Sequence, residues 1–301
     1  MEGLSSKSGI QKHIRSVSLP PRSHPATVKV EQAVNKLKSN EVSSASNSEV
    51  ICSKLCEMTE LYVGVEELLG LQFVRRALSQ NHHDSRVDEL LKESVKFIDV
   101  CSNTRDTVMQ IKQSIADVQC SVRRMKTGDF SSIEANVAAY ILMRKNVQKD
   151  IARFISVLKH SRLVSVPLSN SDSQFSAALK VLTEASIVTI SIFHTLLIFL
   201  SVPVLKPRPN RWSLVSKLMN KGALTGEDQS KKMNELENVD FALGKLTLHD
   251  SFKHLDAEKI EMADKSLKDL ETRVQVIENG LEDVFKHLIR SRVSLLNIFS
   301  Q

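Results

Sequence analysis

Apolar residues recur every three or four positions along residues 256–299, and charged residues fill most of the positions between them. This spacing collects the apolar side chains on one face of a helix, as in a coiled-coil seam. We expect the seam to pack against other helices of the same chain; an exposed coiled coil for protein partners is the alternative. The seam residues are Ile260, Ala263, Leu267, Leu270, Val274, Ile277, Leu281, Val284, Leu288, Leu295 and Ile298, and Ser291 interrupts them.

A second apolar stripe runs through residues 85–127, and its spacing predicts one long helix. At 1.5 Å per residue, ~43 helical residues span ~65 Å, so the body of the protein should be elongated. The stripe consists of Cys101, Val108, Ile111, Ile115, Val118, Val122 and Met125, with Thr104 at a polar position.

Proline is absent between Pro25 and Pro167, which suits helices, because an internal proline removes a hydrogen bond and clashes with the preceding turn. The chain has nine Gly and seven Pro, too few for turn-rich sandwiches and barrels. We therefore predict an all-α fold, an elongated bundle of long antiparallel helices with a coiled-coil-like C-terminal helix. The predicted helices cover residues 27–39, 50–80, 85–127, 132–161, 172–201, 211–220, 230–246 and 256–299.

The first 26 residues are rich in serine, basic residues and proline, and they predict a disordered tail. Residues 27–301 are predicted to form a single helical-bundle domain, with a basic loop near 203–211 and another loop near 221–230. Helix starts are indicated at Ser85, Ser131 and Ser171, because Asp, Glu or Gln follows each serine three positions later and can complete a capping box.

Residues 187–205 carry no formal charge, and their length approaches the ~20 residues that span a bilayer. Basic residues and Trp212 follow, as at membrane flanks. However, His194, Pro203 and four Ser or Thr residues dilute the segment, and a helix apolar on all sides also suits the centre of a large bundle. We expect a core helix, with a membrane-associated or re-entrant helix and a true span as alternatives. The residues that face either the core or a membrane are Ile187, Ile190, Phe193, Leu197 and Leu200.

The net charge of +6 is concentrated in two short segments. Residues 1–26 carry +3 and residues 203–222 carry +5, so the remainder of the chain carries −2. A near-neutral body argues against a nucleic-acid partner. Four cysteines in 301 residues are too few for a disulfide scaffold. We therefore expect a cytoplasmic protein, with peripheral attachment to endomembranes as the alternative.

Motifs that would carry catalysis are missing from the sequence. It contains no glycine-rich phosphate-binding loop and no His-Glu-x-x-His. Cys52 and Cys56 share a helical face without a nearby histidine, and we expect them to be buried core thiols. The run from His82 to Asp84 is expected to be polar residues at a helix entry. The sequence thus predicts no catalytic residue, no cofactor and no metal.

The sharpest short motif is Arg15-Ser16-Val17-Ser18-Leu19-Pro20. It matches Arg-Ser-x-Ser-x-Pro, which 14-3-3 proteins recognise when the second serine is phosphorylated. A basic-directed kinase would read Arg15, and phosphate on Ser18 would offer about −2 charge and three acceptors to an arginine cluster. Pro20 would turn the chain out of the binding groove. The alternative is that these residues belong to a plain disordered tail.

Three stretches, in order along the chain, resemble a plant family. They are His13–Pro25, Phe97–Cys101 with Arg105 and Asp106, and Leu288–Ile298. They are similar to the plant domain of unknown function 241 family, the BYPASS-related proteins. The resemblance implies an all-helical plant protein without established enzymatic activity and with a role in root and shoot development. Because some relatives are membrane-associated, it also leaves the nature of residues 187–205 open.

Three functional hypotheses follow from these observations. The first is a non-enzymatic helical scaffold or regulator whose tail is controlled by phosphorylation. The second is a membrane-associated protein of the endomembranes that attaches through residues 187–205, and the third is an enzyme of unknown chemistry. The charged residues of the resembling stretches also permit physical interpretation. Arg105 and Asp106 can each pair with a neighbouring helix. Arg290 and Arg292 lie near a helix C-terminus, whose dipole attracts cations, and a contact between helices or with a partner is the alternative.

Overall fold

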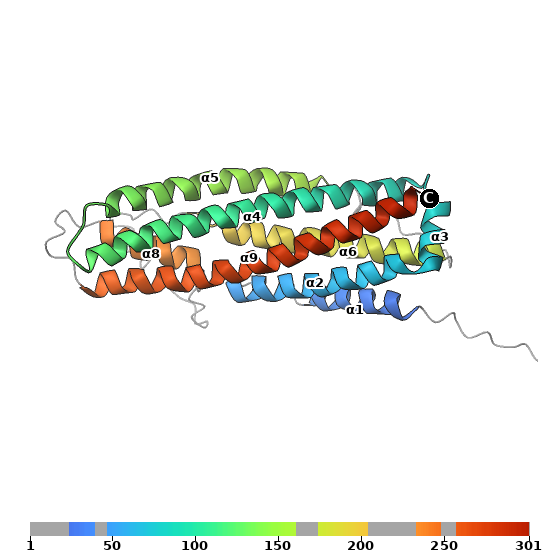
Figure 1. Ribbon diagram of the computed structural model, residues 1–301, viewed down its shortest axis with the longest axis horizontal. Coiled ribbons are helices and arrows are strands. Elements are labelled where there is room, and N and C mark those ends of the chain that lie inside the picture. Colours follow the sequence, from blue (N-terminus) through green and yellow to red (C-terminus); the bar gives the residue numbers. More distant parts are fainter. Residues whose placement is uncertain (1–23, 40–46, 161–173, 204–232, 248–256, 301) are drawn as a thin grey trace, which may run out of the picture.

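The computed structural model describes residues 24–39, 47–160, 174–203, 233–247 and 257–300, which form the long bundle of Figure 1. Every regular element in this part of the chain is an α-helix, and this confirms the predicted all-α fold. The helices are α1 (Pro25–Ser39), α2 (Ser48–Gly70), α3 (Gln72–Gln80), α4 (Ser85–Met125), α5 (Ile133–Lys159), α6 (Gln174–Leu200), α8 (Glu235–Thr247) and α9 (Ala257–Phe299).

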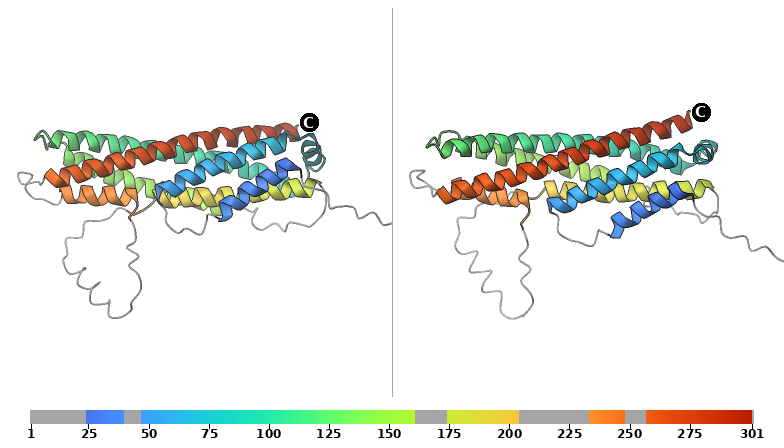
Figure 2. Two further views of the ribbon diagram at one scale, coloured as in Figure 1. Left: turned by 90° about the horizontal axis from the view of Figure 1, so that it is seen from below. Right: turned by 60° about the horizontal axis from the view of Figure 1, so that its bottom comes forward.

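The two longest helices, α4 and α9, lie side by side along the length of the bundle (Figure 1). They contain 41 and 43 residues, so each is about 60 to 65 Å long. On the other side of the bundle α6 and α8 follow one another nearly in line (Figure 2). The helix α5 packs on α4 and α6, α1 packs on α2 and α6, and α3 crosses one end. Apolar side chains from all of these helices form one core.

The apolar stripe of α9 is buried along its whole length, in steps of three and four residues. Leu267, Leu270, Ile277, Leu281 and Val284 are fully enclosed, and Val274 and Leu288 are 1% and 3% exposed. These residues face α4, α2 and α8 of the same chain. The stripe of α4 is buried in the same way, and Thr104 satisfies its hydroxyl by donating to the Val100 carbonyl 2.6 Å away.

Polar pairs flank the contact between α4 and α9 and define its register. Lys112 Nζ lies 2.5 Å from Glu278 Oε2, and Gln119 Nε2 donates to Glu271 Oε2 at 2.8 Å. One further step of seven residues brings Lys126 to Asp264, 2.7 Å apart. Partners that ascend by seven on α4 and descend by seven on α9 show that the helices are antiparallel with a heptad repeat.

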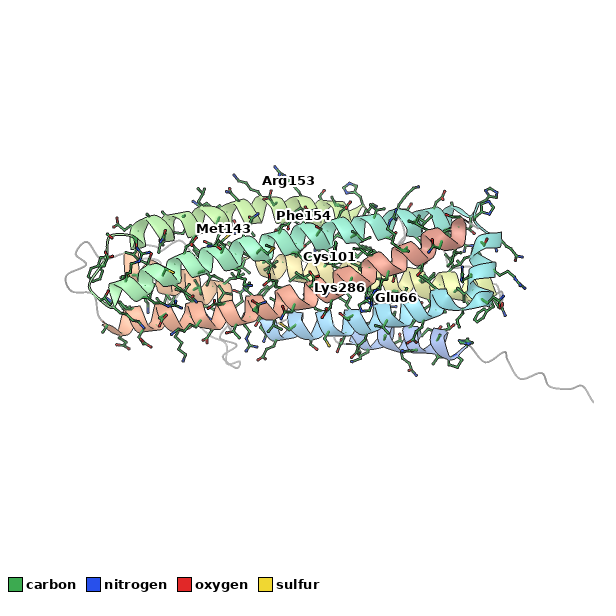
Figure 3. The ribbon with its side chains drawn as sticks, in the orientation of Figure 1. Glu66, Cys101, Met143, Arg153, Phe154 and Lys286 are labelled. Atoms are coloured by element: carbon green, nitrogen blue, oxygen red, sulfur yellow. The ribbon has the colours of Figure 1, made fainter. Side chains whose placement is uncertain are left out.

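Figure 3 places Cys101 within this contact, whereas Arg153 projects from the outer side of α5. The Cys101 thiol is fully buried and points at the Leu281 carbonyl of α9, 3.6 Å away. Burial raises the pKa of this thiol to about 12. Cys101 therefore packs as a small apolar residue with a weak hydrogen bond.

Several predicted boundaries were wrong, each for a local reason. The predicted helix 50–80 is two helices, because the backbone of Leu71 is extended (φ −70°, ψ 128°) and α3 turns across the bundle end. The N-cap of α4 is Asp84 rather than Ser85, since its carboxylate accepts the Arg86 amide at 2.9 Å. Pro25 belongs to α1 as its first residue, where its missing N–H costs no hydrogen bond.

Other predictions fall on parts of the chain beyond the described ranges. They include the tail up to residue 23, the helix at 211–220, and the loop near 221–230. Of the predicted basic loop near 203–211, only Pro203 is described. The helix start at Ser171 also lies outside. At the start of α5, Ser132 is the N-cap in place of Ser131, and its side chain makes no capping hydrogen bond.

Candidate functional site

The apolar segment predicted at 187–205 coincides with the second half of α6. Phe193, Leu197 and Leu200 are buried, whereas Ile187 and Ile190 are partly exposed. The helix packs against α1, α2, α3, α4 and α5, and the Tyr62 and Thr189 hydroxyls lie 3.1 Å apart in a buried hydrogen bond. Among the described helices, α6 alone is long and apolar enough to cross a membrane, with mean hydropathy 1.8 over its best window, of which 61% is buried inside the bundle.

The C-terminal end of α6 is held by two polar side chains of α5. Arg144 donates from Nη1 to the Leu200 carbonyl and from Nη2 to the Val202 carbonyl, each at 2.8 Å. Gln148 Nε2 donates to the same Val202 carbonyl at 3.1 Å. The last carbonyls of a helix lack intrahelical partners and carry the negative end of its dipole, so a guanidinium suits this place.

Arg144 is fully buried, and its charge is balanced by Asp240 of α8. The Arg144 guanidinium and the Asp240 carboxylate approach to 3.8 Å, and neither side chain is exposed to solvent. Tyr140 donates its phenol proton to Asp240 Oδ1 at 2.9 Å. Burial and the neighbouring Asp240 carboxylate raise the pKa of Tyr140 well above its ordinary value. The phenol therefore stays protonated and continues to donate.

The beginnings of α2 and α8 meet close to this cluster. Ser48 at the start of α2 donates from Oγ to Glu235 Oε1 of α8 at 2.5 Å. The N-cap residue Asn47 accepts the Val50 amide at 3.0 Å. In α8, Asn234 and Glu237 exchange side-chain and backbone hydrogen bonds at 2.8 and 2.9 Å, which is a capping box.

We refer to this meeting of helix ends as the junction. It is built from Asn47, Ser48, Tyr140, Arg144, Gln148, Leu200, Val202, Asn234, Glu235 and Asp240. Most of its polar groups bond to one another or to helix ends, although Arg144 Nε is buried without a hydrogen-bond partner among the described residues. The arrangement fixes where α6 stops and where α2 and α8 begin.

Sequence reasoning did not find the junction, although two signals for it exist. Arg144 occupies an apolar phase of α5, in step with Val137, Tyr140, Val147 and Ile151, all of which are buried. A charged residue in such a phase indicates a buried ion pair or a capping role. The spacing of Asn234 and Glu237 is a capping-box signature that marks the start of α8.

A family comparison extends over most of the chain. The family model described as Protein BPS1 matches residues 54–298. This chain belongs to the BPS1 family. The match confirms the resemblance to BYPASS-related proteins that the sequence motifs indicated. No curated protein and no solved structure gave a significant match.

Two of the stretches that carry the BPS1 resemblance lie on neighbouring helices, one on α4 and one on α9, and an arginine of each stretch contacts the other helix. Arg105 forms an ion pair with Glu282, and its guanidinium carbon lies 4.8 Å from the centre of the Phe285 ring. Arg292 Nη1 donates across to the Leu91 carbonyl at 2.9 Å and to Ser94 Oγ at 2.8 Å. These hydrogen bonds to α4 match the alternative interpretation of Arg292 as a contact between helices.

Near these contacts an apolar cavity of about 40 Å³ lies between α2, α4, α6 and α9. Tyr62, Phe97, Leu182 and Leu288 contribute to its walls. Ser291 also lines it, and the Ser291 hydroxyl is buried without a hydrogen-bond partner among the described residues. A cavity of this size has room for about two or three water molecules.

The remaining candidate residues can be placed briefly. The motif Arg15, Ser16, Ser18 and Pro20 lies outside the described residues. Cys56 is exposed and Cys52 half-buried, so the prediction of two buried thiols was wrong; α2 turns Cys56 toward solvent. Within the described residues no group of three or more His, Cys, Asp or Glu side chains is arranged to hold a metal ion.

Proposed function

We propose that this BPS1-family chain is a non-enzymatic helical scaffold or regulatory protein that acts through protein partners. The observation that carries the proposal is the structural use of its buried charges. Arg144 caps α6, Asp240 accepts from Tyr140 of α5, and Asp264 on α9 binds Lys126 of α4. Charges committed in this way hold helices in place, which favours a long, rigid body on which partners assemble.

The developmental part of the proposal follows from the resemblance to BYPASS-related proteins, which implies a role in root and shoot development. Proximity labelling in root tissue tests it and the compartment together. We expect cytoplasmic neighbours, including proteins of developmental signalling. A set of neighbours made only of metabolic enzymes that share one substrate would contradict the scaffold.

Regulation is proposed to act through the tail motif, with Ser18 as the phosphorylated residue and a 14-3-3 protein as the partner. Arg15 supplies kinase recognition, and a phosphate on Ser18 matches the arginine cluster that such partners present. The full chain phosphorylated on Ser18 should bind 14-3-3 protein with a Kd near or below about 1 µM. Ser18→Ala should abolish binding, whereas the control Ser23→Ala, at a serine of the tail outside the motif, should leave it nearly intact. Equal binding by the unphosphorylated chain would contradict this role.

A second candidate function is membrane association through α6, and the hydropathy of this helix is the observation that favours it. Attachment would require α6 to leave the core, because its apolar side chains pack against five neighbouring helices. Fractionation of cells separates the two candidates. Protein that stays in the membrane pellet after carbonate washing supports membrane association, and protein recovered without detergent in the soluble fraction supports the scaffold.

A further inference from the structure

A group of exposed apolar side chains lies at the end of the bundle where α9 finishes and α4 begins. Such side chains are normal when scattered, but a contiguous group marks an interaction site. We refer to this group as the end patch. Its members, with their exposed fractions, are Val95 (37%), Ile289 (38%), Val293 (49%) and Leu296 (41%).

The end patch is one surface shared by two helices. The hydrogen bonds of Arg292 to Leu91 and Ser94 hold the last turns of α9 directly against the first turns of α4. Half-buried Leu91 and Ile98 border the patch on the α4 side. In Figure 1 this part of α4 and α9 faces the viewer, and no described helix lies in front of it.

Opposite charges stand on the two sides of the end patch. Asp99 lies one helical turn after Val95 on α4, and Arg290 directly follows Ile289 on α9. Both side chains are exposed, and within the described residues neither makes an ion pair or a side-chain hydrogen bond. Lys112 and Glu278 further along the same contact pair with each other, whereas Asp99 and Arg290 have no such partner in the described part of the chain.

The register of the two helices puts these charges at the same level along the bundle. Lys112 stands opposite Glu278, so counting back along α4 and forward along α9 brings Asp99 level with position 291. The same count brings Val95 level with position 295. A twofold axis running along the groove between α4 and α9 would therefore place α4 of one copy over α9 of the other without any shift. Asp99 would then face Arg290, and Val95 would face Leu296.

We propose that the end patch binds a second copy of this chain and forms an isologous dimer. In such a dimer each contact occurs twice, since the same surface serves on both copies. Two Asp99–Arg290 pairs flank a centre made of Val95, Ile289, Val293 and Leu296. Lys92 falls level with the last turn of the other copy's α9, where free carbonyls attract a cation.

The first test measures the mass of the full-length chain by sedimentation equilibrium and light scattering. We expect a dimer at about 100 µM that dissociates on dilution into the low micromolar range. Leu296→Glu should weaken the dimer at least about 100-fold, because it places a charge in the centre of the interface. Leu142→Glu is the matched control, since Leu142 is 60% exposed on α5, away from the patch.

Circular dichroism of both variants checks that they fold. A wild-type chain that stays monomeric at about 100 µM overturns the proposal and leaves the patch to a different protein or another segment of this chain. A dimer that Leu296→Glu leaves intact, or that Leu142→Glu disrupts equally, overturns it as well.

The second test uses charge reversal to check the orientation of the two copies. Arg290→Glu and Asp99→Arg should each weaken the dimer about tenfold or more, because like charges then meet twice. Mixing the two variants should restore association, since both contacts of the mixed dimer then join opposite charges. The introduced glutamate faces the introduced arginine, and the unchanged Asp99 of one copy faces the unchanged Arg290 of the other. If the mixture is no tighter than either variant alone, the two copies are not related by this axis and the proposal fails.

Discussion

The contact between α4 and α9 and the junction both place charges inside the bundle, but in different ways. Along α4 and α9 the charges flank a continuous apolar seam, and pairs such as Lys112 and Glu278 remain 36% and 25% exposed. At the junction Arg144 and Asp240 are withdrawn completely from solvent. The first arrangement repeats every seven residues, whereas the second occurs once among the described helices and depends on three helix ends that meet at one place.

The two kinds of charge pair differ in how much the stability of the fold depends on them. A half-exposed pair is worth about 0.2 to 1 kcal/mol, because water already solvates both partners. A fully buried charge that loses its partner costs about 3 to 5 kcal/mol, because nothing replaces the lost solvation. We therefore expect mutations at the junction to change stability much more than mutations along the flanks of the seam.

The largest effect should come from Asp240→Ala, which leaves the Arg144 charge buried without its carboxylate. We expect the free energy of unfolding to fall by about 3 to 5 kcal/mol in urea denaturation. Adding Arg144→Met to this variant should recover part of the loss, because the uncompensated charge is removed while the Leu200 and Val202 carbonyls lose the Arg144 donor. If Asp240→Ala costs no more than Lys112→Ala on the flank of the seam, the contrast between the two regions is wrong.

Asp264 should make the free energy of unfolding depend on pH. It is the most buried acid of α9, with 2% of the residue exposed. Burial disfavours its charge, but hydrogen bonds from Lys126 and Lys268 outweigh this effect and lower its pKa. Because the folded pKa lies below the unfolded value of about 3.9, the stabilisation is present above that pH and disappears as the pH falls through the folded pKa.

Asp264→Asn should therefore cost about 1 to 2 kcal/mol at pH 7 and progressively less below about pH 4. Urea denaturation between pH 7 and pH 2.5 provides the measurement. Asp269→Asn is the matched control, since Asp269 is exposed on the same helix. A constant difference between the Asp264 variant and wild type at every pH would show that the carboxylate charge is not the source of the effect.

Removal of the Ser291 hydroxyl, which interrupts the apolar seam of α9, should stabilise the protein, whereas the two substitutions above should destabilise it. The Ser291 hydroxyl is buried without a partner among the described residues, so Ser291→Ala should raise the free energy of unfolding by about 1 kcal/mol. Thermal unfolding followed by circular dichroism measures this. Ser121→Ala provides the contrast. The Ser121 hydroxyl bonds to Ser132 and Asn136, so its removal should lower the free energy of unfolding. A loss of stability in Ser291→Ala would mean that the hydroxyl is bonded in solution.

The smallest effect should be the coupling between Lys112 and Glu278. A double-mutant cycle with Lys112→Ala and Glu278→Ala should give about 0.2 to 1 kcal/mol. About 1 M salt should reduce this coupling, because it screens half-exposed charges. A coupling above about 2 kcal/mol would mean that this partly exposed pair stabilises the fold as strongly as a fully buried pair, and the contrast with the junction would fail.

The helices could be predicted because their periodic signals are long. The seam of α9 runs from Ile260 to Ile298, and over so many turns a strand or loop cannot reproduce it. Short signals were less informative. Gly70, a residue type common at helix ends, directly precedes Leu71, but a single glycine was too weak a signal to predict the break in the helix 50–80; α3 turns there because it packs across the bundle end.

The candidate site was harder to predict than the fold. Arg144 and Asp240 are 96 positions apart in the sequence, and only the assembled bundle brings these side chains of α5 and α8 together. The end patch was also invisible, because Val95 and Leu296 are ordinary apolar residues until their exposure and the α4–α9 register are known. The pattern along one helix indicates which face of that helix is buried, but it does not indicate which surface of the assembled bundle stays exposed.

The sequence by itself determined the all-α class, the long amphipathic helices and the BPS1-family resemblance, and it supplied the tail motif Arg15–Pro20 whose phosphorylation stays a prediction. These features depend on neighbours within a few turns, whose spacing is written directly in the chain. The tertiary structure alone decided that α6 lies in the core, that Arg144 caps it and that Ser291 has no partner within the described helices. Burial and pairing depend on groups distant in the sequence, and their energies arise only when water is excluded between helices that have already met.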